Sequence, residues 1–174
     1  MIRTAHGDDA PRIAEIHVFG WRAAYRGIIP DGYLFGGLSV TRRAAALAGK
    51  LESEEETYVW EDGPLPSLPG KEPASVIRGW MTIGDSRDED ADGAFELWGI
   101  YVDPLMKRTG VGRALVAFCE AEARARGKSE ITLWVLRDNA PSRAFNEALG
   151  FAPDGKEQFL EGLGTTETRY RKRL

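Results

Sequence analysis

The chain has 174 residues, of which 43% are hydrophobic, and its formal net charge is −4. A chain of this length most simply forms one domain, so we expect a single domain over residues 1–174 with a sizeable core. The mild acidity argues against a general nucleic-acid binder. No apolar run approaches the about 18 residues of a membrane helix, and the N-terminus has no signal-peptide pattern, so we expect a cytoplasmic protein with no membrane partner.

The first part of the chain is expected to hold an edge strand and two helices. Residues 2–5 read as the strand, residues 8–11 cap a helix that carries His17 inward, and residues 40–51 form a second amphipathic helix. Because the chain has no cluster of Cys or His, we expect no metal site and interpret His17 as a structural residue with satisfied hydrogen bonds. The acidic run at 52–56 is interpreted as a solvated helix end and turn.

An aromatic and cationic run, from Trp21 to Leu34, follows the first helix. Trp21 and Tyr25 lie four residues apart, so they share one helix face. Two interpretations stay open at this point: the two rings pack into the core, or they contact a substrate.

The middle of the chain is expected to hold two loops between strands. Residues 57–60 and 76–83 read as a hairpin pair, and the connection at 61–75 contains four prolines, so we expect a long, mobile loop. The second loop, 84–93, is rich in Asp and imitates the start of a calcium site. Since Gly99 stands where such a site needs a bidentate Glu, we interpret this loop as a solvated hairpin turn.

The residues that indicate chemistry begin after a strand at 95–102. There Lys107-Arg108-Thr109-Gly110-Val111-Gly112-Arg113 opens a helix that ends at Gly127 and places Cys119 on its apolar stripe, where it is expected to be a core residue. Two glycines allow a tight turn, the amides of the first helical turn point outward, and three side chains add positive charge. The run therefore predicts a site for a pyrophosphate. A glycine pair at a helix start is a weak signal alone, because an ordinary strand-to-helix turn has it too.

The segment after this helix makes the signal specific. A buried strand at 131–136 leads into Asn139-Ala140-Pro141-Ser142-Arg143-Ala144-Phe145-Asn146-Glu147-Ala148-Leu149-Gly150-Phe151. With the two glycines, this arrangement resembles the GNAT superfamily of acyl-CoA N-acyltransferases, whose signature is Arg/Gln-x-x-Gly-x-Gly/Ala after the fourth strand, then an Asn and a helix ending in Leu-Gly-Phe. The chain departs from that pattern at Lys107, where Arg or Gln is usual, and at Asn146, where many members have Tyr.

The resemblance implies an α+β fold with a mixed central β-sheet flanked by helices and an acyl-CoA cleft between the fourth and fifth strands. The expected order of elements agrees: strand, two helices, three strands, helix, strand, helix and a final strand pair at 156–160 and 165–171. It also implies acetyl-CoA as cosubstrate, with no metal. The residues implied to bind it are Ile100, Tyr101, Val102, Lys107, Arg108, Thr109, Gly110, Val111, Gly112, Arg113, Asn139, Ser142 and Phe145.

Two of these contacts have particular explanations. In the resembled fold the fourth strand bulges near residues 100–102, which frees backbone amides for the acyl carbonyl and the pantetheine arm; Gly99 is consistent with such a bulge. Asn139 could bond the pantetheine amides, and it is equally suited to cap the helix that starts before Pro141. The two roles are compatible.

The resemblance also implies Glu96 as a catalytic residue, because members with a catalytic Glu carry it at this spacing before the pyrophosphate loop. A primary amine with a pKa of about 10.4 is neutral about once in 2,500 at pH 7, which costs about 4.6 kcal/mol. A carboxylate acting through one water could take that proton, and burial beside Phe95 and Trp98 would raise its pKa. An exposed strand carboxylate is the competing interpretation.

Asn146 stands where the family's Tyr protonates the leaving thiolate. An amide can donate a hydrogen bond to a thiolate but cannot protonate it, so Ser142 or Tyr101 serves instead or the thiolate leaves unassisted. For this reason a non-catalytic sensor that binds acyl-CoA stays open as an alternative function. A Rossmann-type dinucleotide binder is disfavoured, because Leu115 stands where its third glycine is needed.

The sequence thus predicts an N-acetyltransferase that moves an acetyl group from acetyl-CoA to a primary amine of a small molecule or peptide by direct attack on the thioester. A subgroup of the resembled family has a similar Trp-x-x-x-Tyr-x-Gly-Ile-x-Pro run over the acceptor side, which makes Trp21 and Tyr25 candidate substrate-binding residues. Aromatic rings with acidic neighbours would suit a cationic amine, and the same residues admit an amino acid or a peptide N-terminus. A homodimer through an edge strand is left open.

Overall fold

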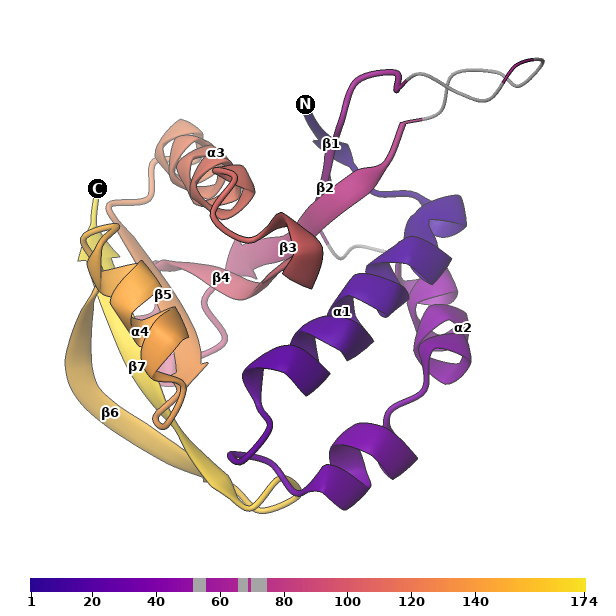
Figure 1. Ribbon diagram of the computed structural model, residues 1–174. Helices are drawn as coiled ribbons and strands as arrows, with labels where there is room; N and C mark the ends of the chain where they lie inside the picture. Colours follow the sequence, from indigo (N-terminus) through magenta and orange to yellow (C-terminus); the bar gives the residue numbers. More distant parts are fainter. Residues whose placement is uncertain (52–55, 66–68, 70–74) are drawn as a thin grey trace.

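The computed structural model describes residues 1–51, 56–65, 69 and 75–174. They form a seven-stranded sheet in the order β1-β2-β3-β4-β5-β7-β6, with helices on both faces (Figure 1). The strands are β1 (Ile2–Thr4), β2 (Glu56–Glu61), β3 (Ile77–Asp85), β4 (Phe95–Val102), β5 (Glu130–Leu136), β6 (Ala152–Leu160) and β7 (Thr165–Arg173). The α-helices are α1 (Ala10–Ala24), α2 (Val40–Leu51), α3 (Val111–Ala125) and α4 (Ala140–Glu147).

The predicted α+β class and the predicted order of elements are confirmed. The sheet is mixed, because β4 and β5 run parallel while the other neighbouring strands are antiparallel. Two features differ from expectation: β6 already begins at Ala152, and the end of the aromatic run forms a π-helical segment, Gly32–Gly37. The acidic run at 52–55 and most of the proline-rich connection, residues 66–68 and 70–74, lie outside the described residues.

Side-chain alternation in the central strands divides the core between the two faces. Phe95 and Leu97 of β4 pack with α3 and α4, while α1 and α2 cover the opposite face over β2 and β3. Cys119 belongs to the α3 side and is 1% exposed, as predicted, and burial raises the pKa of its thiol to about 12. Within the described residues, no helix is both long and apolar enough to cross a membrane.

The Asp-rich loop between β3 and β4 is exposed at Glu89, Asp90 and Asp92, as predicted for a solvated turn, but it is also held by ion pairs that the sequence did not indicate. Arg169 of β7, which is 3% exposed, donates to Asp88 at 3.0 Å, to Asp90 at 2.7 Å and to Asp154 at 2.7 Å. Trp134 of β5 donates its indole N–H to Asp88 at 3.1 Å. A buried guanidinium needs carboxylate partners. Two of them, Asp88 and Asp90, come from this loop, which is far from Arg169 in sequence, and Asp154 comes from β6. The loop is therefore fixed across β5 and β7.

Candidate active site

β4 and β5 are paired only over the first part of β4. Their parallel pairing joins Phe95–Leu97 to Ile131–Leu133 and ends there, whereas β4 continues to Val102. In the described strands, the β5-side edge of residues 99–102 thus has no neighbouring strand. Backbone amides and carbonyls without a ladder partner are open to a ligand.

A β-bulge lies at the point of separation. The register between β3 and β4 shifts so that Gly99 faces Thr82 while Leu97 faces Ile83, which makes Trp98 the extra residue. The sequence-based expectation placed a bulge near residues 100–102, and the structure places it just before them.

The run that follows β4 forms an electropositive helix start. Arg108, with φ 66°, and Gly110, with φ 92°, are both left-handed, and glycine adopts that conformation without strain. Among the described residues, the amides of residues 111–113 find no hydrogen-bond acceptor, and Lys107, Arg108 and Arg113 form no ion pair. Outward amides, the helix dipole and unpaired cations together suit a bound anion.

The second glycine of the run is needed for space. A Cβ at Gly112 would lie 3.2 Å from Cζ of Phe145, so this glycine lets α4 pack closely on the start of α3. Asn139 is buried and accepts a hydrogen bond from the Ser142 backbone N–H at 3.3 Å, which confirms its role as N-cap of α4. The roles of Asn139, Ser142 and Phe145 in cofactor binding stay predictions.

Glu96 lies on the face opposite Phe95 and is 1% exposed, which excludes the interpretation as an exposed strand residue. Its carboxylate accepts hydrogen bonds from the Arg87 backbone N–H at 2.9 Å and from Nε at 3.2 Å, and the other guanidinium arm completes an ion pair. Arg87 is 58% exposed and its guanidinium lies 4.8 Å from the centre of the Trp98 ring. The Glu96 carboxylate is therefore buried and is bound by Arg87, whose own side chain is exposed to solvent.

Glu167 of β7 is a second carboxylate near this position, and sequence reasoning missed it. Burial raises the pKa of Glu167, and the negative charge of Glu96 adds to that rise. Burial also raises the pKa of Tyr25 and of Tyr101, and the charge of Glu167 contributes to both. Only the pairing of β7 with β5 brings Glu167 here, opposite Leu136, so no local motif could have indicated it.

The aromatic run packs against the core and against α1. The ring centroids of Trp21 and Tyr25 are 5.1 Å apart, and both residues contact the cluster of Ile29, Leu34 and Leu136. The packing interpretation is thus confirmed for both side chains, and a contact with substrate stays a prediction.

Asn146 is 5% exposed near the end of α4, where its backbone carbonyl accepts hydrogen bonds from the N–H groups of residues 149 and 151.

The interpretation of His17 as a satisfied core residue is wrong in one respect. His17 is 5% exposed, as expected for a core residue, but its Nδ1 has no hydrogen-bond partner among the described residues. Its neighbours are the rings of Trp21, Trp80 and Tyr101, with centroids 4.9, 6.0 and 5.0 Å away. Burial, with the charge of Arg43, lowers the pKa of His17 to about 3.

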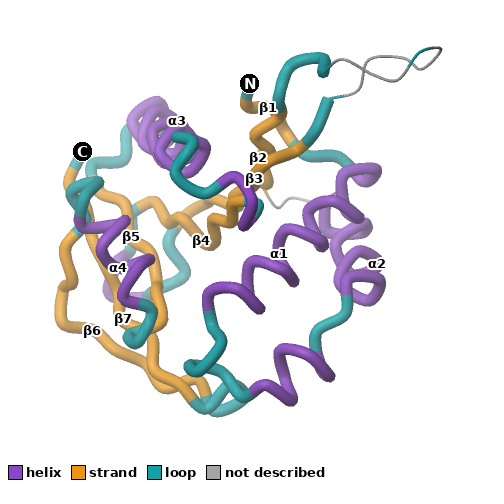
Figure 2. The backbone as a smooth tube through the Cα atoms, viewed as in Figure 1, coloured by secondary structure: helices purple, strands orange, loops and turns teal. Residues whose placement is uncertain are grey.

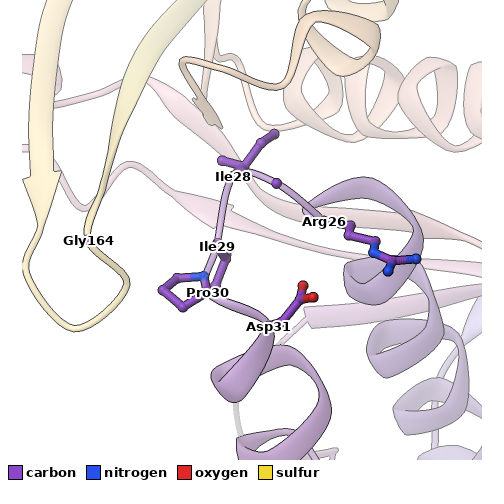
Figure 3. A pocket seen from close by; sticks show the side chains of 7 residues that line it. Arg26, Ile28, Ile29, Pro30, Asp31 and Gly164 are labelled. Carbon is purple, nitrogen blue, oxygen red and sulfur yellow. The ribbon is translucent and has the colours of Figure 1, made fainter.

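A hollow is lined by the connection after α1 and by the turn between β6 and β7. These two segments meet at one end of the molecule (Figure 2). The volume of the hollow is about 460 Å³, and it is lined by residues 26–31 and Gly164. Figure 3 shows the Gly164 turn on one side of this hollow and the loop from Arg26 to Asp31 on the other. None of the residues predicted for the site lines it.

Comparison with known proteins identifies the family to which the chain belongs. The sequence profile described as "Acetyltransferase (GNAT) family" matches residues 40–151, which is more than half of the chain. The chain therefore belongs to the GNAT acetyltransferase family and is an acyltransferase of that family.

Individual relatives are similar over different shares of their length. The chain is 32% identical to an uncharacterized N-acetyltransferase, YuaI, of Bacillus subtilis over 148 residues, which covers 84% of this chain and 77% of that protein. It is 31% identical to a mycothiol acetyltransferase of Kocuria rhizophila over 100 residues, covering 56% of this chain and 33% of that protein.

Two solved structures share the fold. One is the PaiA N-acetyltransferase of Thermoplasma acidophilum in complex with coenzyme A, with a TM-score of 0.72, 16% identity and coverage of 100% of this chain and 98% of that chain. The other is YncA of Salmonella typhimurium with acetyl-CoA, with a TM-score of 0.65, 24% identity and coverage of 100% and 93%.

Proposed function

We propose that this chain, as one domain over residues 1–174, transfers an acetyl group from acetyl-CoA to a primary amine of a small molecule or peptide. The observation that carries the proposal is the placement of three features along β4. Glu96 lies near its start, the open backbone edge follows the bulge, and the cationic helix start comes directly after the strand. One strand thus joins a buried carboxylate, a place for an acyl carbonyl and an anion site.

The residues around this strand fit acetyl-CoA. The free amides of residues 111–113 and the side chains of Lys107, Arg108 and Arg113 would hold the pyrophosphate. The open edge at residues 100–102 would bind the acyl carbonyl and the pantetheine arm, with Asn139, Ser142 and Phe145 alongside from α4. The bound coenzyme A of PaiA and the bound acetyl-CoA of YncA support this assignment.

Direct attack on the thioester is the mechanism that these residues support. Glu96, through one water, takes a proton from the ammonium group of the acceptor, and the free amine then forms the new N–C bond. The nitrogen gives up its excess proton to water as the tetrahedral intermediate collapses. Backbone amides at the open edge of β4 stabilise the oxyanion as the C–S bond breaks. The chain's one cysteine, Cys119, is buried and its thiol has a pKa raised to about 12, which makes an acylated cysteine unsuitable as an intermediate.

The chain differs from many relatives at the step in which the thiolate leaves. Asn146 cannot supply a proton, and the hydroxyls of Ser142 and Tyr101 are the candidate donors. Asn146 is also the observation that favours the second candidate function, a sensor that binds acyl-CoA without turnover.

The test is acetyl-CoA-dependent thiol release measured over a panel of amino acids, polyamines, aminoglycosides and peptides. We expect one class of amine to drive release and Glu96→Gln to suppress it. Glu89→Gln is the matched control, because Glu89 is exposed and forms no hydrogen bond or ion pair with the described residues. If the protein binds acetyl-CoA but no amine drives thiol release, the result would favour the sensor.

A further inference from the structure

A small cavity lies on the α1 and α2 face of the sheet, beside the open part of β4. Its volume is about 160 Å³, and its lining comes from α1, α2, β3 and β4. The lining residues are His17, Arg43, Leu47, Lys50, Trp80, Thr82, Trp98, Gly99 and Tyr101. We call this space the α2 cavity.

Three polar atoms of this lining are buried and have no partner in the part of the chain that the structure describes, and they come from three different elements. They are Nδ1 of His17 on α1, Nε of Arg43 on α2 and Nε1 of Trp80 on β3. His17 and Trp80 are each 5% exposed. The indole and guanidinium N–H groups can only donate, and a buried donor left unpaired is costly. The natural occupant of the α2 cavity is therefore a group that accepts several hydrogen bonds.

The positive charge of the lining residues favours an anion as the occupant of the α2 cavity. Arg43 and Lys50 lie seven residues apart on α2, which places them on one face of the helix. Arg43 forms no ion pair with any described residue, and no Asp or Glu is among the described residues that line the cavity. The lining thus combines positive charge with hydrogen-bond donors, the combination that binds a carboxylate. A polyamine in the same place would meet the like charge of Arg43.

The α2 cavity also shares residues with the proposed reaction site. Gly99 and Tyr101 line it and belong to the stretch of β4 whose other edge is open. Trp98 lines it too, and the guanidinium over the Trp98 ring is the one that pairs with Glu96. A group bound here would thus lie beside the strand that we propose holds the thioester.

We propose that the α2 cavity binds the carboxylate of the acceptor, and that the acceptor is a small molecule with an amine and a carboxylate, that is, an amino acid or a close analogue. This rests on the proposed N-acetyltransferase function. The cavity volume of about 160 Å³ is enough for a carboxylate with a short stem.

The kinetic test compares each L-amino acid with its own carboxamide as acceptor, since the two differ in charge but hardly in shape. The proposal expects thiol release to be driven by amino acids, with their amides at least about tenfold poorer in kcat/KM. Amides or polyamines that equal the amino acids would overturn it.

Two variants test the cavity itself. Arg43→Gln keeps most of the side chain and removes the charge, and Trp80→Phe keeps an aromatic ring and removes the N–H. Both should raise the KM for the amino acid, by about 10- to 100-fold for Arg43→Gln, and leave the KM for acetyl-CoA unchanged. The control is Arg42→Gln, an exposed arginine of the same helix that donates to the Gly37 carbonyl at 2.7 Å and does not line the cavity.

A binding measurement separates this inference from the proposed function. Calorimetric titration of the amino acids and their amides, in the presence of coenzyme A, needs no turnover. Binding that requires the carboxylate and is lost in Arg43→Gln supports the α2 cavity even if no amine drives thiol release. Equal binding of acid and amide, or binding unchanged by Arg43→Gln, means that the α2 cavity does not hold the carboxylate and overturns the inference, even in an active enzyme.

Discussion

Replacing Glu96 by Gln should remove the catalytic base with little harm to the fold. Gln has nearly the same size and keeps one oxygen that can accept from the Arg87 backbone N–H, which lies 2.9 Å from the carboxylate. Arg87 is 58% exposed, so water can solvate its charge once the partner is gone. We expect the free energy of unfolding to fall by about 1–2 kcal/mol, which urea denaturation measures.

The catalytic cost should be much larger. A positioned general base contributes about 10²- to 10⁴-fold, so Glu96→Gln should lower kcat by at least about 100-fold at pH 7. Without the base, only acceptor molecules that are already neutral can react. The rate of the variant should therefore rise about tenfold per pH unit up to the pKa of the acceptor amine, and the gap to wild type should narrow by about 1.4 kcal/mol per unit.

The assay is steady-state thiol release by wild type and Glu96→Gln from pH 6.5 to 9.5, with Glu167→Gln measured alongside. Glu167 is the other carboxylate near this position, and burial raises its pKa. A gap between wild type and Glu96→Gln that stays constant with pH would refute the assignment of Glu96 as base. A larger loss in Glu167→Gln than in Glu96→Gln would transfer that role to Glu167.

Three further perturbations have expected outcomes. Gly112→Ala places a Cβ 3.2 Å from the Phe145 ring, so it should raise the KM for acetyl-CoA about tenfold with little change in the KM for the acceptor, and initial-rate kinetics checks this. Asn146→Ala should lower kcat less than Glu96→Gln does, because an amide cannot protonate the thiolate; the reverse order would contradict the proposed mechanism. Since burial lowers the pKa of His17 to about 3, the unfolded chain, with a His pKa of about 6.5, takes up this proton first as the pH falls. Stability that is fully present above pH 6.5 is thus lost below it, by about 2 kcal/mol at pH 5, and denaturation of His17→Gln should show a shallower loss between pH 7 and 5.

Features that depend on a few neighbouring residues could be predicted from the sequence alone. Gly110 and Gly112 after an apolar strand indicated the helix start, and the structure explains them by a left-handed φ at one and by close packing of Phe145 at the other. Asn139 before Pro141 indicated the N-cap of α4 in the same way. Turns, caps and helix starts depend on neighbours in sequence, so they can be read from it.

Features that depend on distant partners could not be predicted. The ion pairs that hold the exposed Asp-rich loop form only because β7 brings Arg169 to it, and Glu167 becomes a candidate only because β7 pairs with β5. The unpartnered Nδ1 of His17 is a consequence of how α1, α2 and β3 enclose the α2 cavity. In each case the decisive fact is which elements are adjacent in space, and a single sequence does not state that.

The most direct test of the account follows the acetyl group itself. Enzyme is mixed with acetyl-CoA labelled in the acetyl group, with and without the best amino acid, then quenched within one turnover and analysed by mass spectrometry. The account predicts label on the acceptor amine in the same amount as free thiol, and no labelled protein when the acceptor is left out. Labelled protein would contradict direct attack, and bound acetyl-CoA that labels no amine would contradict an N-acetyltransferase.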